Sequence, residues 1–333
     1  MNMKKSRDPF WDAAKGVAIV LVAFGHAIQY GSGRDFLWGS LYFNQRVFQF
    51  IYSFHMPLFM LISGYFFNKT LSHKKTIDIV VNKFQNLFVP IVCFTIIKLV
   101  LRFLFSNNHS WDISLFPFYL IDTLWFLWAC LGCSFVCLII EKSNTSRIAY
   151  IFILLVLCSS TNLYNIEYIT YMLPYFLIGM YVSRKGLEHI LYRKDVLIIS
   201  FVLFAILLLF YNQDCFIYTT GTCVTNPFRP NQIFIDIYRW TIGFAGSICV
   251  LCLIKLVVID GHKWLRWIGS MSMGIYCWQD TACRICFRVT KNWATENVVC
   301  WVFAFIIILG IPLILTFITS KSSFIKTLLY GKR

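Results

Sequence analysis

Three ionisable residues share one apolar segment near the N-terminus. Asp12, Lys15 and His26 lie in a run that is otherwise apolar enough to cross a membrane as a helix. Ionisable groups are costly inside a bilayer, and those that occur there usually have a function. Lys15 and His26 are about three helical turns apart, so both face one side of the helix, roughly 16 Å from each other along its axis. A cation near one membrane surface and a deeper imidazole would therefore line one cavity.

This pair suits proton transfer next to a bound anion. The unperturbed pKa of histidine is about 6.5, which allows His26 to act as a general base toward a hydroxyl at neutral pH. Structural roles are also open to these residues. His26 can bond to another membrane helix, and Lys15 can extend to the membrane interface. Asp12 can stabilise the start of a helix through the helix dipole, or it can pair with Lys15.

The composition is that of a membrane protein. Of the 333 residues, 59% are hydrophobic and 14% are charged, against about 25% charged residues in soluble domains. We therefore predict an all-α fold: a polytopic membrane helical bundle formed by a single domain over 1–333, with no separate soluble domain. A span needs about 20 apolar residues. This criterion predicts about ten transmembrane helices, at 13–30, 47–67, 84–105, 119–140, 148–163, 168–182, 196–211, 234–258, 267–288 and 297–318.

The basic residues predict an orientation. Lysine and arginine gather in alternate loops, which the positive-inside rule assigns to the cytoplasm. Both termini are then cytoplasmic, and we expect the membrane to be a bacterial inner membrane. This bias accounts for the net charge of +15. The expected partner of the basic segments is therefore the lipid bilayer and not a nucleic acid.

The cysteines and the short motifs exclude several kinds of site. Of 13 cysteines, Cys215 and Cys223 fall in a predicted outer loop, where either a disulfide or two thiols would fit. No cysteine and histidine pattern has metal-ligand spacing. The sequence also lacks a phosphate-binding glycine loop and a GxSxG nucleophile motif. We therefore expect a site without a metal ion.

Several motifs follow one another along the predicted spans. They are Arg7…Asp12…Lys15-Gly16…Gly25-His26, Met56-Pro57-Leu58-Phe59, Ser63-Gly64, Trp125-Phe126, Leu173–Met180 and Ile268–Tyr276. In order and spacing they resemble the acyltransferase-3 family of integral membrane acyltransferases, and the resemblance covers nearly the whole chain. Members of this family attach acetyl or other short acyl groups to glycans, lipids and antibiotics.

The resemblance implies a reaction and a set of roles. The protein would move an acyl group from acyl-CoA, first of all acetyl-CoA, to a hydroxyl on a surface or exported glycan, which is a carbohydrate or glycolipid acceptor. His26 would be the general base. The resemblance does not supply its partner; from charge and depth in the membrane we add Asp280 as a second catalytic residue, with Asp280 or Asp12 orienting His26 or balancing its charge. Lys15, Lys83 and Arg7 would hold the phosphates of the donor. The residues expected to contact the substrates, or to support those that do, are Asp12, His55, Ser63, Trp125 and Arg284.

Two positions depart from the family pattern. The family usually has a second basic residue three positions after Lys83, and this chain has Asn86. It often has a histidine near the end of the ninth span, where this chain has Gln279 and Asp280. These departures leave open how the donor is held and what Gln279 does. Packing is an open alternative for His55, Ser63 and Trp125.

A second group of charges is predicted in the outer half of the membrane. Asp280 and Arg284 are four residues apart and should pair on one helical face, as intramembrane charges generally do. The basic residues that remain are Lys98, Arg102 and Arg288. They would suit an anionic acceptor or an acidic acyl group such as succinyl, unless they extend to the interface. A transporter or flippase for a glycan or lipid-linked substrate is the alternative function, although no inverted repeat supports it.

Overall fold

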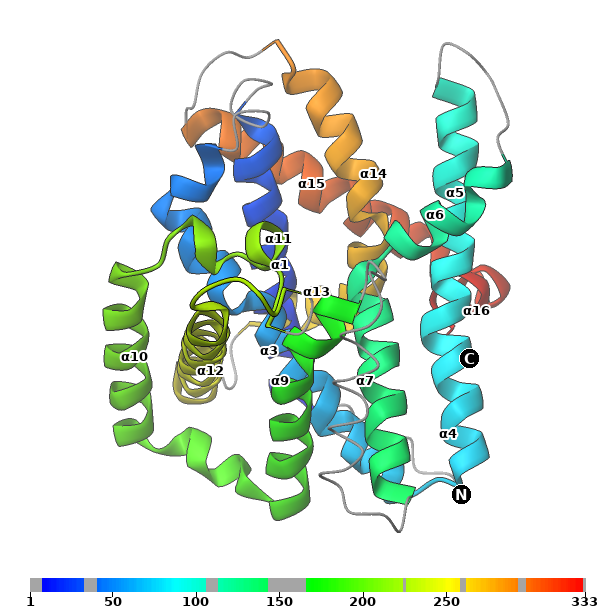
Figure 1. The fold of residues 1–333 in the computed structure, drawn as a ribbon. Coiled ribbons are helices and arrows are strands. Elements are labelled where there is room, and N and C mark those ends of the chain that lie inside the picture. Colours follow the sequence, from blue (N-terminus) through cyan, green and yellow to red (C-terminus); the bar gives the residue numbers. More distant parts are fainter. Residues whose placement is uncertain are drawn as a thin grey trace. The chain divides into compact units, whose positions relative to one another are not determined.

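The computed structural model describes residues 8–32, 41–105, 113–142, 166–223, 226–257, 262–292 and 298–331. Every regular element in these ranges is a helix (Figure 1), which confirms the all-α class. The predicted span 148–163 and Arg7 lie outside the described residues. The chain forms two compact units. Unit 1 is Met1–Ile62, Gly186–Gln213 and Thr241–Ile318; unit 2 is Ser63–Lys185, Asp214–Trp240 and Thr319–Arg333.

Six helical stretches of the described chain are long and apolar enough to cross a membrane. They are α1 (Pro9–Gly31), α3 (Arg46–Leu71), the continuous run Thr76–Phe105, α7 (Trp125–Lys142), the segment Gln232–Leu256 of α12 (Gln232–Val257) and α15 (Val298–Thr319). Each overlaps a predicted span. The prediction of a membrane protein is therefore supported, whereas the count of ten and the orientation of the termini stay predictions.

Two other predicted spans form helices that are not both long and apolar enough to be counted among these six. The prediction 168–182 corresponds to α9 (Ile166–Lys185), which has charged residues at both ends. The prediction 196–211 corresponds to α10 (Lys194–Leu209), which has 16 residues. Such a helix is roughly 24 Å long, shorter than a hydrocarbon core of about 30 Å. Much of its apolar surface is exposed, as on Ile199 and Phe201, and this suits contact with lipid.

The predicted spans 119–140 and 267–288 are wrong as single helices. The first is divided into α6 (Phe116–Asp122) and α7 by Leu124, whose φ of 55° is rare for a large side chain. The second is divided at Met271 into α13 (Lys263–Ser270) and α14 (Ser272–Thr290). Apolar side chains continue through both breaks, so hydrophobicity alone cannot reveal them.

The third predicted span, 84–105, begins too late. Its helix starts at Thr76 as α4 (Thr76–Lys83), passes through a π-helical segment η2 (Phe84–Phe88) and continues as α5 (Val89–Phe105). Such π-helical insertions are rare and often lie at functional sites. The shorter elements are η1 (Leu41–Asn44), η3 (Ile113–Leu115), η4 (Leu187–Tyr192), η5 (Gln213–Cys215), α11 (Ile217–Thr220) and α16 (Ser323–Tyr330).

Unit 1 is organised around α1. This helix begins where Asp8 accepts a hydrogen bond from the backbone N–H of Phe10, with Pro9 at its first position. It packs along α13 and α14. A Cβ on Gly16 would overlap the carbonyl oxygen of Leu265, and one on Gly269 would overlap the carbonyl oxygen of Asp12. Glycine at both positions therefore lets the backbones of α1 and α13 meet directly.

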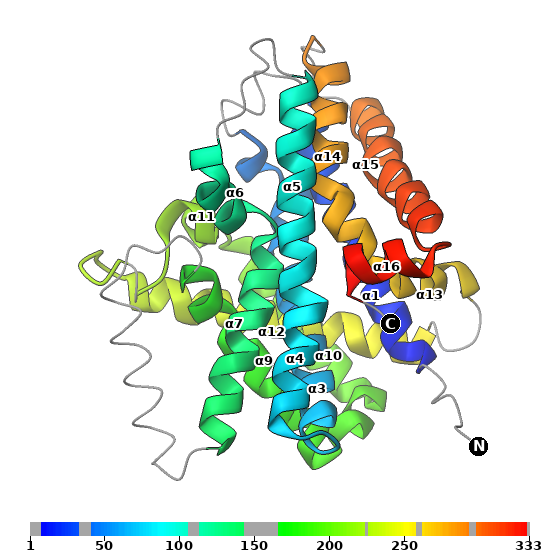
Figure 2. The same ribbon diagram turned by 90° about the vertical axis from the view of Figure 1, so that its right-hand side faces the viewer.

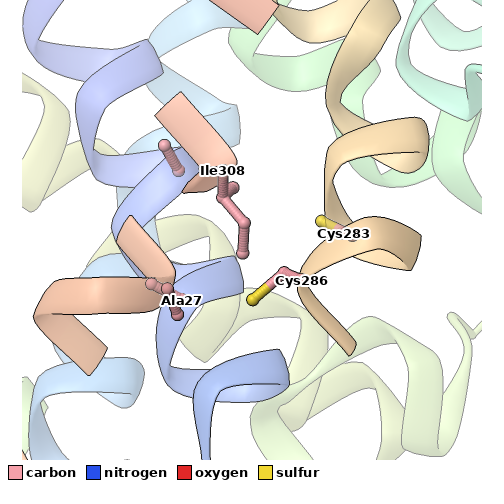
Figure 3. Close-up of a cluster of buried hydrophobic side chains, with 6 residues drawn as sticks. Ala27, Cys283, Cys286 and Ile308 are labelled. Carbon is pink, nitrogen blue, oxygen red and sulfur yellow. The ribbon is translucent and has the colours of Figure 1, made fainter. Parts of the chain in front are cut away.

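A small apolar cluster continues this packing toward the other end of α1. Ala27 lies opposite Cys283 and Cys286 of α14 and Ile308 of α15 (Figure 3). Figure 2 shows α15 running beside α14. Small side chains from three helices fill this contact, so α14 is held against α1 over much of its length.

Unit 2 contains a buried ion pair that holds an irregular segment in place. Arg239 and Asp236 of α12 are each 1% exposed and lie 3.0 Å apart. Arg239 also donates to the carbonyl oxygens of Cys215 at 2.9 Å and Phe216 at 3.0 Å. A buried pair is tolerable when hydrogen bonds satisfy the remaining donors. Arg239 thus fixes the start of α11 against α12.

The glycine contact between α1 and α13 leads to a first prediction. Gly269→Ala would push a methyl group into the backbone of α1, and we expect a destabilisation of about 1–3 kcal/mol, as for overpacked cores. The measurement is the melting temperature of the protein in nanodiscs. Gly310→Ala in α15 is the matched control, because a Cβ there meets no atom within 4 Å. Equal melting temperatures for the two variants would contradict the proposed contact.

Candidate active site

His26 lies half-buried on α1 and has partners from its own helix and from α14. Its Nδ1 is 3.3 Å from Oε1 of Gln29. When Nδ1 donates its proton to this amide oxygen, Nε2 keeps a lone pair that can accept a proton. The carboxylate of Asp280 on α14 is close enough for its charge to act on the imidazole.

Aromatic rings form the surroundings of this imidazole. The ring centroid of Tyr52 on α3 is 6.5 Å from that of His26, and that of Tyr30 is 6.1 Å away. Tyr52 is held by stacking on Phe48 at 3.9 Å. A Cβ on Gly25 would come within 2.6 Å of the Tyr52 ring. Glycine before His26 therefore allows Tyr52 to pack against α1 beside the imidazole.

His55 supports this group from within the core. It is 3% exposed, and its Nδ1 donates to the backbone oxygen of Ile51 at 2.7 Å. Its ring packs against Tyr52, with centroids 4.8 Å apart. Because Tyr52 also contacts His26, His55 lies behind the aromatic residue that borders the base. Whether His55 supports the site or only packs in the core stays a prediction.

The neighbour of Asp280 along α14 is a buried amide with unmet hydrogen-bonding capacity. Gln279 is 3% exposed, and neither Oε1 nor Nε2 has a hydrogen-bond partner in the part of the chain that is described. A buried polar group left unpaired costs about 1–3 kcal/mol. Such a cost is acceptable where a ligand or water supplies the partner.

The predicted ion pairs around the site are present. Lys15 Nζ is 2.6 Å from Oδ1 of Asp12. Arg284 Nε is 3.0 Å from Oδ2 of Asp280, one helical turn away. Both arginine and aspartate of the second pair are about half exposed, so this pair contributes little to stability. The ion pair leaves the carboxylate of Asp280, which is 49% exposed, accessible on the side that faces away from the core.

The second predicted group of cations is partly neutralised. Lys98 of α5 lies 2.8 Å from the carboxylate of Asp122. Lys98 and Arg102 both lie over the ring of Tyr119, at 5.6 and 5.3 Å from its centroid. These basic residues belong to unit 2, whereas Asp280 and Arg284 belong to unit 1. The structure therefore does not describe one cationic cluster that joins them.

Lys83 belongs to unit 2 and is predicted to hold phosphates of the acyl donor. Its Nζ is 4.8 Å from the ring centroid of Phe67. The nearest titratable groups that act on it are the thiols of Cys130, Cys133 and Cys137. Within the described chain no carboxylate pairs with this lysine. The amine of Lys83 therefore has no carboxylate counter-ion among these residues. Asn86 follows in the π-helical segment η2.

Ser63 and Trp125 occupy different environments in unit 2. The thiol of Cys130 donates to Oγ of Ser63 at 3.8 Å, and a Cβ on Gly64 would overlap the carbonyl oxygen of Phe176. The Ser63-Gly64 pair thus lies at a close helix crossing. Trp125 packs on Tyr168, with ring centroids 4.5 Å apart, and Tyr168 approaches Tyr218 at 6.3 Å. Next to Trp125 are the positive φ of Leu124 and the Oγ1 of Thr123, which is buried without a hydrogen-bond partner among the described residues.

Some features were missed or left open by the sequence. Tyr52 and Gln29 are three residues from His55 and His26, a helical spacing that could have indicated both.

Cys215 and Cys223 are thiols, and no disulfide joins them. In the described ranges no group of three or more His, Cys, Asp or Glu side chains could hold a metal ion. Arg7 lies outside those ranges.

These features define an all-helical membrane protein with a histidine and a carboxylate on adjacent helices of unit 1. The model of the acyltransferase-3 family, described as an acyltransferase domain, matches residues 8–317. The chain belongs to this family.

Two curated relatives share part of the sequence. Nodulation protein NolL of Mesorhizobium japonicum is 37% identical over 129 residues, which are 37% of this chain and 33% of that protein. Nodulation protein NolL of Sinorhizobium fredii is 36% identical over 133 residues, which are 38% of this chain and 35% of that protein. The matches thus span about a third of the length of each relative. No solved structure matches this chain.

The packing of Tyr52 on Gly25 leads to a second prediction. Gly25→Ala places a methyl group against the tyrosine ring and displaces the ring from His26. We expect acyl transfer to fall about tenfold or more, because small displacements at a reacting group are costly. The measurement is turnover by purified protein. Gly310→Ala in the same unit is the control, and it should keep wild-type turnover. Full activity of Gly25→Ala would show that this contact is not needed.

Proposed function

We propose that the protein is a membrane O-acyltransferase that moves an acetyl or other short acyl group from acyl-CoA to a hydroxyl of a surface or exported glycan. Membership of the acyltransferase-3 family supports the reaction class. The observation that carries the role of the site is the contact of His26 Nδ1 with Gln29, on a helix that packs along α14, the helix that carries Asp280. The proposed location is a bacterial inner membrane, with both termini in the cytoplasm.

The proposed reaction uses His26 as a general base. Nε2 takes the proton of the acceptor hydroxyl as the oxygen attacks the carbonyl carbon of the thioester. The tetrahedral intermediate then breaks its carbon–sulfur bond and releases the thiolate of CoA, which takes the proton from the imidazolium. Asp280 stabilises the imidazolium that forms between these steps. The products are the acyl ester and CoA, and no metal ion takes part in this sequence.

The other residues have proposed roles in binding and support. Lys15, Lys83 and Arg7 are proposed to hold the phosphates of the donor. Asp12 pairs with Lys15 and would set the direction of its ammonium group. Gln279 would bond to a substrate through its buried amide, which supplies both a donor and an acceptor.

The acceptor is proposed to contact the aromatic group around Trp125. Rings of Trp125, Tyr168 and Tyr218 lie close together, and Tyr218 is 46% exposed. Sugar rings present apolar C–H faces that pack on aromatic side chains, and ligand sites commonly combine aromatic walls with a few polar groups. Ser63, His55 and Arg284 are proposed to support the site, not to react.

A transporter or flippase would also place charges inside the membrane. Nothing in the described residues specifically favours it, and the family points to acyl transfer. Uptake of a glycan by vesicles without acyl-CoA would be the mark of that function.

The role of His26 gives the third prediction. His26→Ala removes the proposed base, and we expect acceptor-dependent release of CoA from acetyl-CoA to fall by about 10²–10⁴-fold. The measurement uses purified protein in nanodiscs with an extracted surface-glycan fraction. His189→Ala removes an exposed histidine, which contacts only the carbonyl of Gly186, and should keep full activity. Equal rates for His26→Ala and wild type would remove His26 as the base.

The role of Asp280 gives the fourth prediction. Asp280→Asn keeps the shape of the side chain but removes the charge that favours the imidazolium, so we expect turnover to fall about tenfold or more. Arg284→Gln removes only the exposed partner of Asp280, and its effect should be smaller. The comparison is made by kcat at saturating donor. If Arg284→Gln is the more damaging change, the ion pair and not the carboxylate matters.

A further inference from the structure

Unit 2 contains a pocket of about 470 Å³ that the analysis of sequence motifs did not indicate. It lies where the C-terminal ends of α3, α7 and α9 come together, at the lower edge of the view in Figure 1. The volume is in the range of small-molecule sites, about 300–1,000 Å³. The side chains that matter to its chemistry are Asn68, Lys69, His73, Glu141, Lys142 and Arg184.

Arg184 is held in place at the wall of this pocket. Its Nη2 donates to Oε1 of Glu141 at 2.8 Å, and its Nε is 3.4 Å from Oδ1 of Asn68. Asn68 is 7% exposed, and its amide nitrogen donates to Oγ of Ser183 at 3.2 Å. The guanidinium is therefore oriented before any ligand binds. Its Nη1 has no partner within the described residues.

The pocket carries more positive than negative charge. Glu141 is its one acidic lining residue, and Arg184 already binds it. Lys69 lies over the ring of Tyr65 at 4.4 Å, and no described carboxylate pairs with Lys69 or Lys142. His73 adds a further nitrogen donor when protonated. An oriented arginine with two lysines beside it is the donor set that recognises phosphate oxygens.

The pocket is also next to a residue with an available charge. Asn68 lines it, and Phe67, the preceding residue of α3, is the ring over which Lys83 lies. Both belong to unit 2. Lys83 itself does not line the pocket. The orientation predicted from the basic loops places this end of the helices on the cytoplasmic side, where acyl-CoA is made.

We propose that this pocket binds the phosphate groups of a phosphorylated ligand, with Arg184, Lys69 and Lys142 as the phosphate contacts. The ligand that fits the proposed function, on which this assignment rests, is the nucleotide of acyl-CoA, which carries a phosphomonoester and a diphosphate. The pocket would supply phosphate contacts in addition to those proposed for Lys15, Lys83 and Arg7. An anionic phospholipid headgroup offers the same chemistry from the membrane. The experiment below separates the two sources.

The test measures ligand binding without catalysis. Wild-type protein in nanodiscs of phosphatidylcholine is titrated with CoA and with adenosine 3′,5′-bisphosphate. The variant is Lys69→Gln combined with Lys142→Gln, which keeps Arg184 and its partners. The matched control is Lys74→Gln combined with Lys185→Gln, which removes the same charge from exposed residues that do not line the pocket. A second arm measures retention of phosphatidylglycerol by the three proteins.

We expect both nucleotides to bind the variant about tenfold or more weakly, because the variant loses two charge-assisted contacts to phosphate oxygens, while the control binds as wild type does. If the variant retains less phosphatidylglycerol than wild type and control but binds both nucleotides normally, the phosphate site is supported and its ligand is a lipid. Equal binding by variant and control in both arms would overturn the proposal, as would binding of neither ligand by wild type.

Acyl transfer is measured on the same proteins to keep the two proposals apart. A nucleotide site predicts a raised KM for acyl-CoA in the variant with little change in kcat. Nucleotide binding that depends on Lys69 and Lys142, in a protein that transfers no acyl group, would overturn the proposed function and support the pocket. Full acyl transfer by the variant, with unchanged KM and unchanged nucleotide binding, would support the proposed function and overturn the assignment of the pocket.

Discussion

Direct contact between the backbones of α1 and α13 is the constraint on which unit 1 depends. Gly16 and Gly269 face one another there, and a side chain on either would overlap the opposite backbone. Because α14 follows α13 after the break at Met271, this contact also determines where Asp280 stands beside His26. The glycines of the motifs thus act through geometry: they let α1, which carries His26, pack directly against the segment that leads into α14 and Asp280.

The same site depends on how polar groups are satisfied in an apolar setting. Asp12 with Lys15 and Asp236 with Arg239 form compact pairs, as buried charges must. Gln279 and Lys83 are different, because their hydrogen-bonding or charge capacity is not used by the described chain. Because the charges buried in the described part of the chain form pairs, Gln279 and Lys83 are the groups that we propose for contacts with substrates. His26 is intermediate, with one nitrogen engaged and one available.

Departures from regular helix lie next to the motif residues in both units. Leu124, with positive φ, precedes Trp125; η2 follows Lys83; and the break at Met271 follows Gly269. Sparsely populated backbone conformations and π-helical turns cost free energy and occur where the surrounding packing maintains them. Their positions indicate that the helix interruptions set the direction of the side chains of neighbouring motif residues such as Trp125 and Lys83.

The sequence by itself determined the class of the protein, the family and the contacts that are local to one helix. Apolar length predicted α1, α3 and α15, and helical spacing predicted the pairs Asp12 with Lys15 and Asp280 with Arg284. These features depend on neighbours within one or two turns, which a linear pattern records.

Only the tertiary structure decided the rest. It placed Tyr52 and Asp280 beside His26, divided two predicted spans, and formed the basic pocket around Arg184. Apolar residues continue through the breaks in both helices, so the hydrophobicity of the sequence does not reveal where a helix is interrupted. The contacts of the base and of the pocket join segments far apart in the chain, and their distances arise from packing between helices, which no spacing along the sequence specifies.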